Sequence, residues 1–414
     1  MKKILQMLLA ACRALWLGGL KLLGWPWRWL VLLLGLGPPA AGPQRSEKSG
    51  PGNPPHAPSG PEPAAPQPPP AAAGRPRDEV IEDLEPAEPE PRDEMAADVA
   101  AAERPEPLAP RTRAARAGQF TEGVFRNDAG QRDYKLYVPD GKPPGLVPLV
   151  VMLHGCKQDP DDFAAGTRMN QLADRQTLIV LYPAQTRSAN PYACWNWFNR
   201  RDQQRDAGEP SMIAGMIKEV VAMHPVDPRR VYVAGLSAGG AMATILAHTY
   251  PELLAAAGIH SGLPYAAAQD MITALGVMKR GAAKRVAPAR AKAPAKGAGA
   301  KTGVPLIVFH GDHDKTVHPL NGEHVVEQAL ALAHAAKPHD LGHPAVHAGR
   351  VAGGHAYIRT VHTDRAGQVQ VEHWRVQGAG HAWSGGDAKG SFTDPLGPDA
   401  SAEMLRFFLE RSAA

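Results

Sequence analysis

Apolar and polar residues follow a regular pattern from about residue 118 to the end of the chain. Residues 119–126 and 132–138 mix polar residues with β-prone apolar ones, and the turn sequence NDAG at residues 127–130 separates them. This pattern is typical of a β-hairpin. Residues 148–153 and 178–182 are continuously apolar instead, as in strands that a parallel sheet buries on both faces. The pattern therefore predicts a sheet that begins with a hairpin and continues with buried strands.

Strands and helices alternate through the rest of this region. We expect further strands at residues 231–234, 256–260, 304–310 and 369–376, and helices at residues 210–223, 240–248, 322–333 and 401–410. Such alternation is typical of a parallel sheet with helices on both faces. We therefore predict one α/β domain over residues 118–414, with a mostly parallel central sheet.

The first 117 residues have a different pattern. Residues 1–36 are rich in Leu and Trp, but Arg13, Lys21 and Arg28 interrupt the apolar run. This composition favours a signal- or anchor-like segment, which is cleaved, spans a membrane, or lies on a membrane or polymer surface. Residues 37–117 are rich in Pro and Ala and then acidic, so they cannot bury enough apolar surface to fold. We expect them to form a disordered linker.

Composition excludes some partners and leaves others open. The net charge is +4 over 414 residues, which gives no indication of nucleic-acid binding. Residues 282–301 form a basic low-complexity insertion, which either binds an anionic surface or, as we expect, is a solvated loop. The histidines of residues 333–362 are irregularly spaced among glycines and prolines, and we expect no metal site there.

A G-x-S-x-G sequence at residues 235–239, with Ser237 at its centre, is the first motif that carries chemistry. It lies between the β-prone residues 231–234 and the small-residue helix predicted at 240–248. A strand–turn–helix of this kind is a nucleophile elbow, in which a strained turn presents a serine to the substrate. The alternative is an ordinary turn with a solvent-exposed serine. The position of the motif favours the elbow.

A serine becomes a nucleophile when a histidine takes its proton and a carboxylate orients that histidine. In the elbow architecture the order is serine, acid, histidine, each after a strand. The strand predicted at residues 304–310 is followed by Asp312 and Asp314, and the last predicted strand is followed by His381. These are the candidate acid and base, and the pattern alone does not separate the two aspartates. Metal binding by the same His-Asp cluster is the alternative, and we expect no metal.

Attack by such a serine on a carbonyl group also needs hydrogen-bond donors for the oxyanion that forms on the carbonyl oxygen. The residue after the nucleophile supplies one backbone amide, here that of Ala238. A second amide comes from the loop after an earlier strand, and the sequence LHGC at residues 153–156 occupies that place. We therefore expect the amides of Ala238 and Cys156 to form the oxyanion hole.

Five segments together resemble a known family. They are LHGCKQ at residues 153–158, CWNWF at 194–198, GLSAGG at 235–240, HGDHDKTV at 310–317 and GHAWSGG at 380–386. This series resembles the poly(3-hydroxybutyrate) depolymerase family of esterases, which are secreted α/β-hydrolases related to feruloyl and acetylxylan esterases. The resemblance covers about residues 118–411. It implies an α/β-hydrolase fold and no cofactor, and by position it makes Ser237 the nucleophile, Asp314 rather than Asp312 the acid, and His381 the base.

The family also has cysteines at the positions of Cys156 and Cys194. Because both lie on loops beside the candidate site, we expect a disulfide between them, with two buried thiols as the alternative. A disulfide requires an oxidising compartment, so we expect an extracellular or periplasmic protein, either free or membrane-anchored. The alternative is a cytoplasmic enzyme attached to a surface through residues 1–36.

The resemblance implies a serine esterase that hydrolyses short-chain hydroxyalkanoate esters, as oligomer or polymer, through an acyl-enzyme. Trp195, Trp197 and Trp383 either line the acyl cleft or pack in the core. The alternatives are a feruloyl- or acetylxylan-type carbohydrate esterase and a non-catalytic, surface-attached binding protein. We expect no additional polymer-attaching domain of the kind that some family members have, which argues against attack on crystalline polyester.

Overall fold

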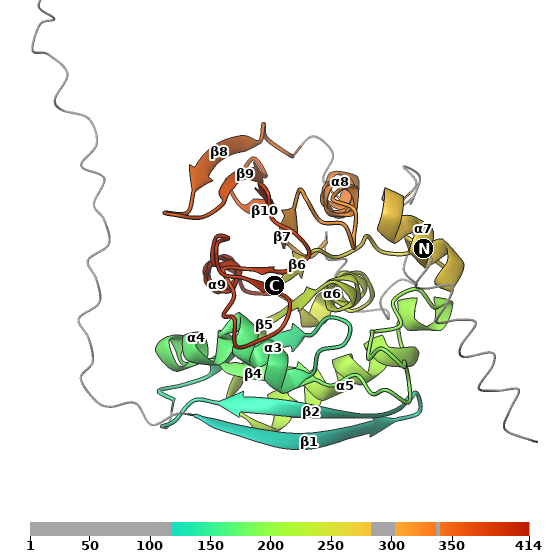
Figure 1. Ribbon diagram of the computed structural model, residues 1–414. Helices are drawn as coiled ribbons and strands as arrows, with labels where there is room; N and C mark the ends of the chain where they lie inside the picture. Colours follow the sequence, from blue (N-terminus) through green and yellow to red (C-terminus); the bar gives the residue numbers. More distant parts are fainter. Residues whose placement is uncertain (1–117, 142, 283–302, 337–339, 414) are drawn as a thin grey trace, which may run out of the picture. The chain divides into compact units, whose positions relative to one another are not determined.

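The computed structural model describes residues 118–141, 143–282, 303–336 and 340–413 (Figure 1). The signal- or anchor-like segment 1–36, the linker 37–117 and nearly all of the basic insertion lie outside these ranges. Within them, none of the helices combines the length and apolar character that a membrane crossing requires.

One ten-stranded sheet forms the centre of the described domain, in the order β1-β2-β4-β3-β5-β6-β7-β10-β9-β8 (Figure 1). The six strands from β4 to β10 in this order run parallel, and the pairs at both edges are antiparallel. The strands are β1 (Gln119–Asn127), β2 (Gly130–Val138), β3 (Val147–Leu153), β4 (Ile179–Pro183), β5 (Val226–Leu236), β6 (Ala256–His260), β7 (Leu306–Gly311), β8 (Ala345–Arg350), β9 (Ala356–Thr363) and β10 (Val369–Val376). The short strands β11 (Trp383–Ser384) and β12 (Thr393–Asp394) pair separately.

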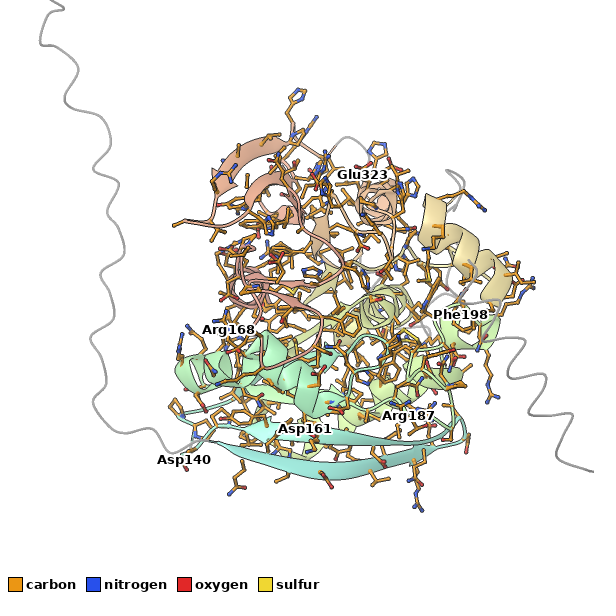
Figure 2. The ribbon with its side chains drawn as sticks, in the orientation of Figure 1. Asp140, Asp161, Arg168, Arg187, Phe198 and Glu323 are labelled. Atoms are coloured by element: carbon orange, nitrogen blue, oxygen red, sulfur yellow. A yellow bond between two sulfur atoms is a disulfide. The ribbon has the colours of Figure 1, made fainter. Side chains whose placement is uncertain are left out.

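Helices cover both faces of the sheet, as the sequence predicts. The helices are α3 (Pro160–Thr167), α4 (Met169–Gln176), α5 (Gly208–Met223), α6 (Ala238–Thr249), α7 (Met271–Arg280), α8 (Leu320–Ala336) and α9 (Ala400–Leu409), with short 3-10 turns η1 (Arg200–Gln203) and η2 (Pro251–Leu253). Side chains of α5 to α8 share one hydrophobic core with the sheet, and those of α3, α4 and α9 share the other. The side chains fill the space between these layers (Figure 2).

The continuous apolar runs of the sequence become the middle of the sheet, because strands buried on both faces need apolar residues at every position. Every residue of β3 and of β4 is buried. The register brings the carboxyl ends of the central strands to one edge, where Leu153 pairs with Gly235 and Leu236 pairs with His260. Loops that follow these strands therefore meet at this edge.

The structure contains elements that the sequence pattern did not predict. Helices α3, α4 and α7 and strands β8 and β9 lie in stretches without a predicted element. Strand β8 is the outermost strand and is exposed almost throughout, with Val346 64% exposed. An edge strand with so little buried surface needs no apolar alternation, which is why its sequence gives no strand signal.

Candidate active site

Ser237 occupies the strained turn between β5 and α6. Its φ of 58° and ψ of −117° lie in a region that residues with a Cβ rarely adopt. The turn is possible because its neighbours are glycines: a Cβ on Gly235 would lie 2.4 Å from the carbonyl of Gly239, and a Cβ on Gly239 would lie 2.0 Å from the Leu153 oxygen. The G-x-S-x-G sequence thus forms the tight elbow that its position predicts.

Backbone hydrogen bonds connect the elbow and the loops after β6, β7 and β10 along one edge of the sheet. The Ser237 amide donates to the His260 carbonyl at 2.9 Å, at the end of β6. The next residue, Ser261, donates to Phe309 on β7 at 2.9 Å, and Asp312 donates to Val376 on β10 at 3.1 Å. The elbow and the loops after β7 and β10 therefore lie on the same edge in a fixed order.

Asp314 and His381 are in direct contact across two of these loops. His381 Nδ1 lies 2.6 Å from Asp314 Oδ2, so the ring donates Nδ1–H to the carboxylate and keeps the Nε2 lone pair free to accept a proton. The other carboxylate oxygen accepts the amides of Thr316 and Val317, each at 2.8 Å. Burial alone raises the pKa of Asp314, but the hydrogen bonds from His310 and His381 hold that pKa well below its usual range.

Asp312 has a different environment, although it is only two residues away. Its side chain is 33% exposed, and it accepts the Gly378 amide at 2.7 Å. It therefore ties the β7 loop to the β10 loop. Because Asp314 and not Asp312 receives the His381 ring, the geometry favours Asp314 as the acid.

His154, at the start of the loop after β3, is buried and neutral. Its Nδ1–H donates to the Gly155 carbonyl at 2.8 Å, and its Nε2 accepts the Gln185 amide at 3.1 Å. Burial lowers the pKa of this histidine, which keeps the accepting nitrogen unprotonated. The side chain therefore fixes the start of the loop that contains Cys156.

Most amides of this loop already have acceptors inside the protein. Those of Gly155 and Lys157 donate to Gln158 Oε1 at 2.9 Å and to the Tyr192 carbonyl at 2.7 Å. The Cys156 amide between them has no acceptor among the residues that the structure describes. Ala238 is the first residue of α6, where backbone amides lack partners within the helix. These two amides are therefore available to an external oxyanion.

The structure joins Cys156 and Cys194 in a disulfide, as expected from the resemblance. The bond spans 38 residues of sequence and attaches the loop after β3 to the segment that follows β4. The Lys157–Tyr192 backbone hydrogen bond lies beside it. The loop that contains Cys156 is therefore held both covalently and by hydrogen bonds.

The three tryptophans considered for the acyl cleft are all buried, with exposed fractions of 0% for Trp195, 5% for Trp197 and 1% for Trp383. Trp195 Nε1 donates to the His154 carbonyl at 3.2 Å, and Trp383 Nε1 donates to Ser401 Oγ at 3.0 Å. This burial favours the packing alternative for all three residues.

His260 is a residue of the site that the sequence analysis missed. It is buried, its Nδ1 lies 3.2 Å from Ser261 Oγ, and its Nε2 accepts the Ser384 amide at 3.0 Å. Burial lowers its pKa to about 3. Because Ser384 follows His381 by three residues, His260 holds the loop of the candidate base. The available signal was its position at the end of the strand next to the elbow.

Arg168 adds a second attachment for this loop. It lies in the turn between α3 and α4 (Figure 2), and its guanidinium donates to the Gly385 carbonyl at 2.6 Å and to Asp399 at 2.8 Å. In the part of the chain that the structure describes, no three or more His, Cys, Asp or Glu side chains are grouped so that they could hold a metal ion. The candidate site therefore consists of Ser237, the Asp314–His381 pair and two backbone amides, without a metal ligand set among the described residues.

Such a sheet, with a serine elbow and an Asp–His pair at one edge, defines the class of α/β-hydrolases. A solved structure, the acetyl xylan esterase from Aspergillus awamori, has a similar fold, with a TM-score of 0.51 and 18% identity over 67% of this chain and 93% of that one. The model of the family described as Esterase PHB depolymerase matches residues 132–338, which is half of the chain. The protein belongs to this family.

Named relatives cover two kinds of ester hydrolase. The poly(3-hydroxyalkanoate) depolymerase C of Paucimonas lemoignei is 34% identical over 258 residues, which are 62% of this chain and 60% of that protein. The feruloyl esterase B of Neurospora crassa is 35% identical over 31% of this chain and 44% of its own length. The poly(3-hydroxybutyrate) depolymerase of Ralstonia pickettii is 28% identical over 59% and 49%. The chain thus spans about half of the length of these relatives.

Proposed function

We propose that the protein is a serine esterase that hydrolyses short-chain hydroxyalkanoate esters through an acyl-enzyme. The observation that carries the proposal is the Asp314–His381 contact of 2.6 Å on the sheet edge where Ser237 occupies the strained elbow. The family of the chain and two relatives named as polyhydroxyalkanoate depolymerases support the substrate class.

The geometry suggests a role for each group. Ser237 Oγ attacks the ester carbonyl, and His381 Nε2 takes its proton, because Nδ1–H is already donated to Asp314. The amides of Ala238 and Cys156 bind the oxyanion. The alcohol then leaves with the proton from His381, and water, activated by the same nitrogen, releases the hydroxy acid from Ser237.

A carbohydrate esterase is the second candidate, because the relatives include feruloyl esterases and acetylxylan esterases. A non-catalytic binding protein is less well supported, because it would need neither a strained serine nor an Asp–His pair at the same sheet edge. The disulfide supports an oxidising compartment, extracellular or periplasmic. For residues 1–36, which lie outside the described ranges, we propose export or attachment to a membrane or polymer surface.

One product assay separates these candidates. The purified chain is incubated with 3-hydroxybutyrate oligomers, polyhydroxybutyrate film, feruloylated sugars and acetylated xylan, and the released acids are quantified. We expect 3-hydroxybutyrate release from the oligomers to exceed ferulate and acetate release. Preferential ferulate or acetate release would replace the proposed substrate class, and no release from any ester, including p-nitrophenyl butyrate, would contradict the esterase assignment.

A further inference from the structure

Glu209 is a buried carboxylate behind the oxyanion loop that the proposed chemistry does not use. It lies in the first turn of α5, and its side chain is only 3% exposed. It accepts the backbone amide of Asn196 at 2.7 Å, the side-chain amide of Asn196 at 2.8 Å and the Arg132 guanidinium at 3.3 Å. It also accepts the side-chain amide of Gln185. A buried acid with this many donors ties several segments together.

Gln185, one of the hydrogen-bond partners of Glu209, also contacts residues that hold the loop containing Cys156. The backbone amide of Gln185 donates to His154 Nε2 at 3.1 Å, and its side chain donates to the Cys194 carbonyl at 2.9 Å. Cys194 is in turn bonded to Cys156. Two routes therefore connect Glu209 to the oxyanion loop: one through His154 at its start, and one through the disulfide.

The hydrogen-bond geometry around Glu209 is that of an ionised carboxylate. All of these contacts donate hydrogen bonds to the carboxylate, and Arg132 adds a positive charge. The start of a helix also favours a negative charge. Burial and the Asp202 carboxylate nevertheless raise the pKa of Glu209 above its usual value, although the hydrogen bonds from Asn196 and Gln185 act in the opposite direction. An uncharged amide in place of the carboxylate would turn an NH₂ group toward these donors.

We propose that Glu209 is a positioning residue for the oxyanion hole: it holds Gln185 and Asn196 so that His154 and the disulfide keep the Cys156 amide directed at the reacting carbonyl. This inference rests on the proposed esterase function. Glu209 acts only through these neighbours. Because an oxyanion donor acts in the transition state, its displacement lowers kcat and leaves KM nearly unchanged.

The test compares Glu209→Gln with Glu372→Gln. Glu372 is also buried, at 1% exposed, and accepts Arg359 at 2.9 Å and Trp374 at 2.7 Å, but its partners do not touch the oxyanion loop. Active sites are titrated with a fluorophosphonate, so that kcat refers to folded enzyme. Turnover of p-nitrophenyl butyrate and inhibition by butylboronic acid, which forms a tetrahedral serine adduct, are then measured.

We expect Glu209→Gln to lower kcat about 10- to 100-fold, somewhat less than the loss of an oxyanion donor itself. KM should stay within about twofold, and the affinity for the boronic acid should fall in parallel with kcat. Glu372→Gln should lower thermal stability and leave kcat within about twofold. A kcat within about twofold of wild type for Glu209→Gln, or equal losses in both variants, would overturn the inference.

Asn196→Asp keeps the test decisive if Glu209→Gln does not fold. This change places a second carboxylate against Glu209, and we expect the same selective loss of kcat. Combining it with Glu209→Gln restores an amide–carboxylate pair in reversed order, which should recover part of the lost kcat. An unchanged kcat in Asn196→Asp overturns the inference. If wild-type enzyme itself shows no turnover, the proposed function fails, a result distinct from an active Glu209→Gln variant.

Discussion

The candidate site has an oxyanion side, which is the loop that contains Cys156, and a base side, which is the loop that contains His381. A buried histidine supports each of these two loops. On the oxyanion side, His154 Nε2 accepts the Gln185 amide at 3.1 Å. On the base side, His260 Nε2 accepts the Ser384 amide at 3.0 Å. Burial lowers the pKa of both histidines. Both sides thus use a neutral imidazole to fix the loop that carries a functional group.

The two sides differ in what the loop presents. The base side presents a side chain, His381, whose orientation is fixed by a direct contact with Asp314. The oxyanion side presents a backbone amide, whose direction is set by the course of the loop and not by the rotamer of a side chain. Its position depends on the whole loop, and the disulfide and the Glu209 contacts supply that support. A group that acts through its backbone therefore needs more supporting residues than one that acts through its side chain.

Removing the proposed nucleophile, Ser237, should have the largest effect on kcat. We expect Ser237→Ala to lower kcat by about 10⁶, because neither the base nor the oxyanion hole replaces the covalent step. Turnover of p-nitrophenyl butyrate and the circular dichroism spectrum are the measurements. Near wild-type turnover in a folded Ser237→Ala variant would show that the serine is not the nucleophile.

Disrupting the Asp314–His381 contact on the base side should have the next largest effect on kcat. Asp314→Asn should lower kcat by about 10⁴, because an amide in this place stabilises the wrong tautomer of His381. Asp312→Asn is the matched control, and it should lower kcat less than about tenfold, because Asp312 contacts the Gly378 amide and not His381. The reverse order of the two kcat values would transfer the role of the acid to Asp312.

Breaking the oxyanion side should affect both activity and stability. Replacing Cys156 and Cys194 by serine removes a cross-link over 38 residues, which in the chain-entropy model costs roughly 4 kcal/mol of unfolding free energy. It should also lower kcat, with little change in KM, because the Cys156 amide is no longer fixed. Urea unfolding and steady-state kinetics measure the two effects. A stable variant with wild-type kcat would mean that the disulfide does not support the oxyanion loop.

Sequence and structure agree best for the residues that we propose to act through their side chains. The order of Ser237, the two aspartates and His381 after apolar strands was enough to propose the catalytic groups. The central strands were equally predictable, because burial on both faces leaves long apolar runs. The choice between Asp312 and Asp314 needed either the family resemblance or the contacts in the structure, since spacing alone does not show which carboxylate faces the histidine.

The supporting residues could not be predicted in this way. Glu209 and Gln185 are far from Cys156 in sequence, and nothing in their local sequence shows which segment they contact. His260 ends a predicted strand, but 17 histidines in the chain give its presence little weight. Strand β8 was missed because an exposed edge strand needs no apolar pattern. Tertiary contacts define these features, and the local pattern does not contain them.

Acid should lower the free energy of unfolding by a smaller amount, because the buried histidine on each side of the site is neutral in the folded protein. The folded-state pKa of His260 is about 3, below the value of about 6.5 in an unfolded chain. As the pH falls below about 6.5, the unfolded chain binds a proton that the folded protein does not, so stability falls with falling pH. His260 therefore contributes at most about 1.4 kcal/mol per pH unit to the slope of unfolding free energy against pH.

Glutamine at position 260 separates this effect from other titrations. In His260→Gln, the side-chain oxygen can still accept the Ser384 amide, but it does not titrate. We expect the slope of unfolding free energy against pH, measured by urea unfolding between pH 6 and pH 5, to fall by up to about 1.4 kcal/mol per pH unit. In this interval most carboxylates remain ionised in both states. His154→Gln should lower the slope in the same direction on the oxyanion side. An unchanged slope in either variant would show that the histidine on that side is protonated in the folded protein and does not hold its loop as a neutral acceptor.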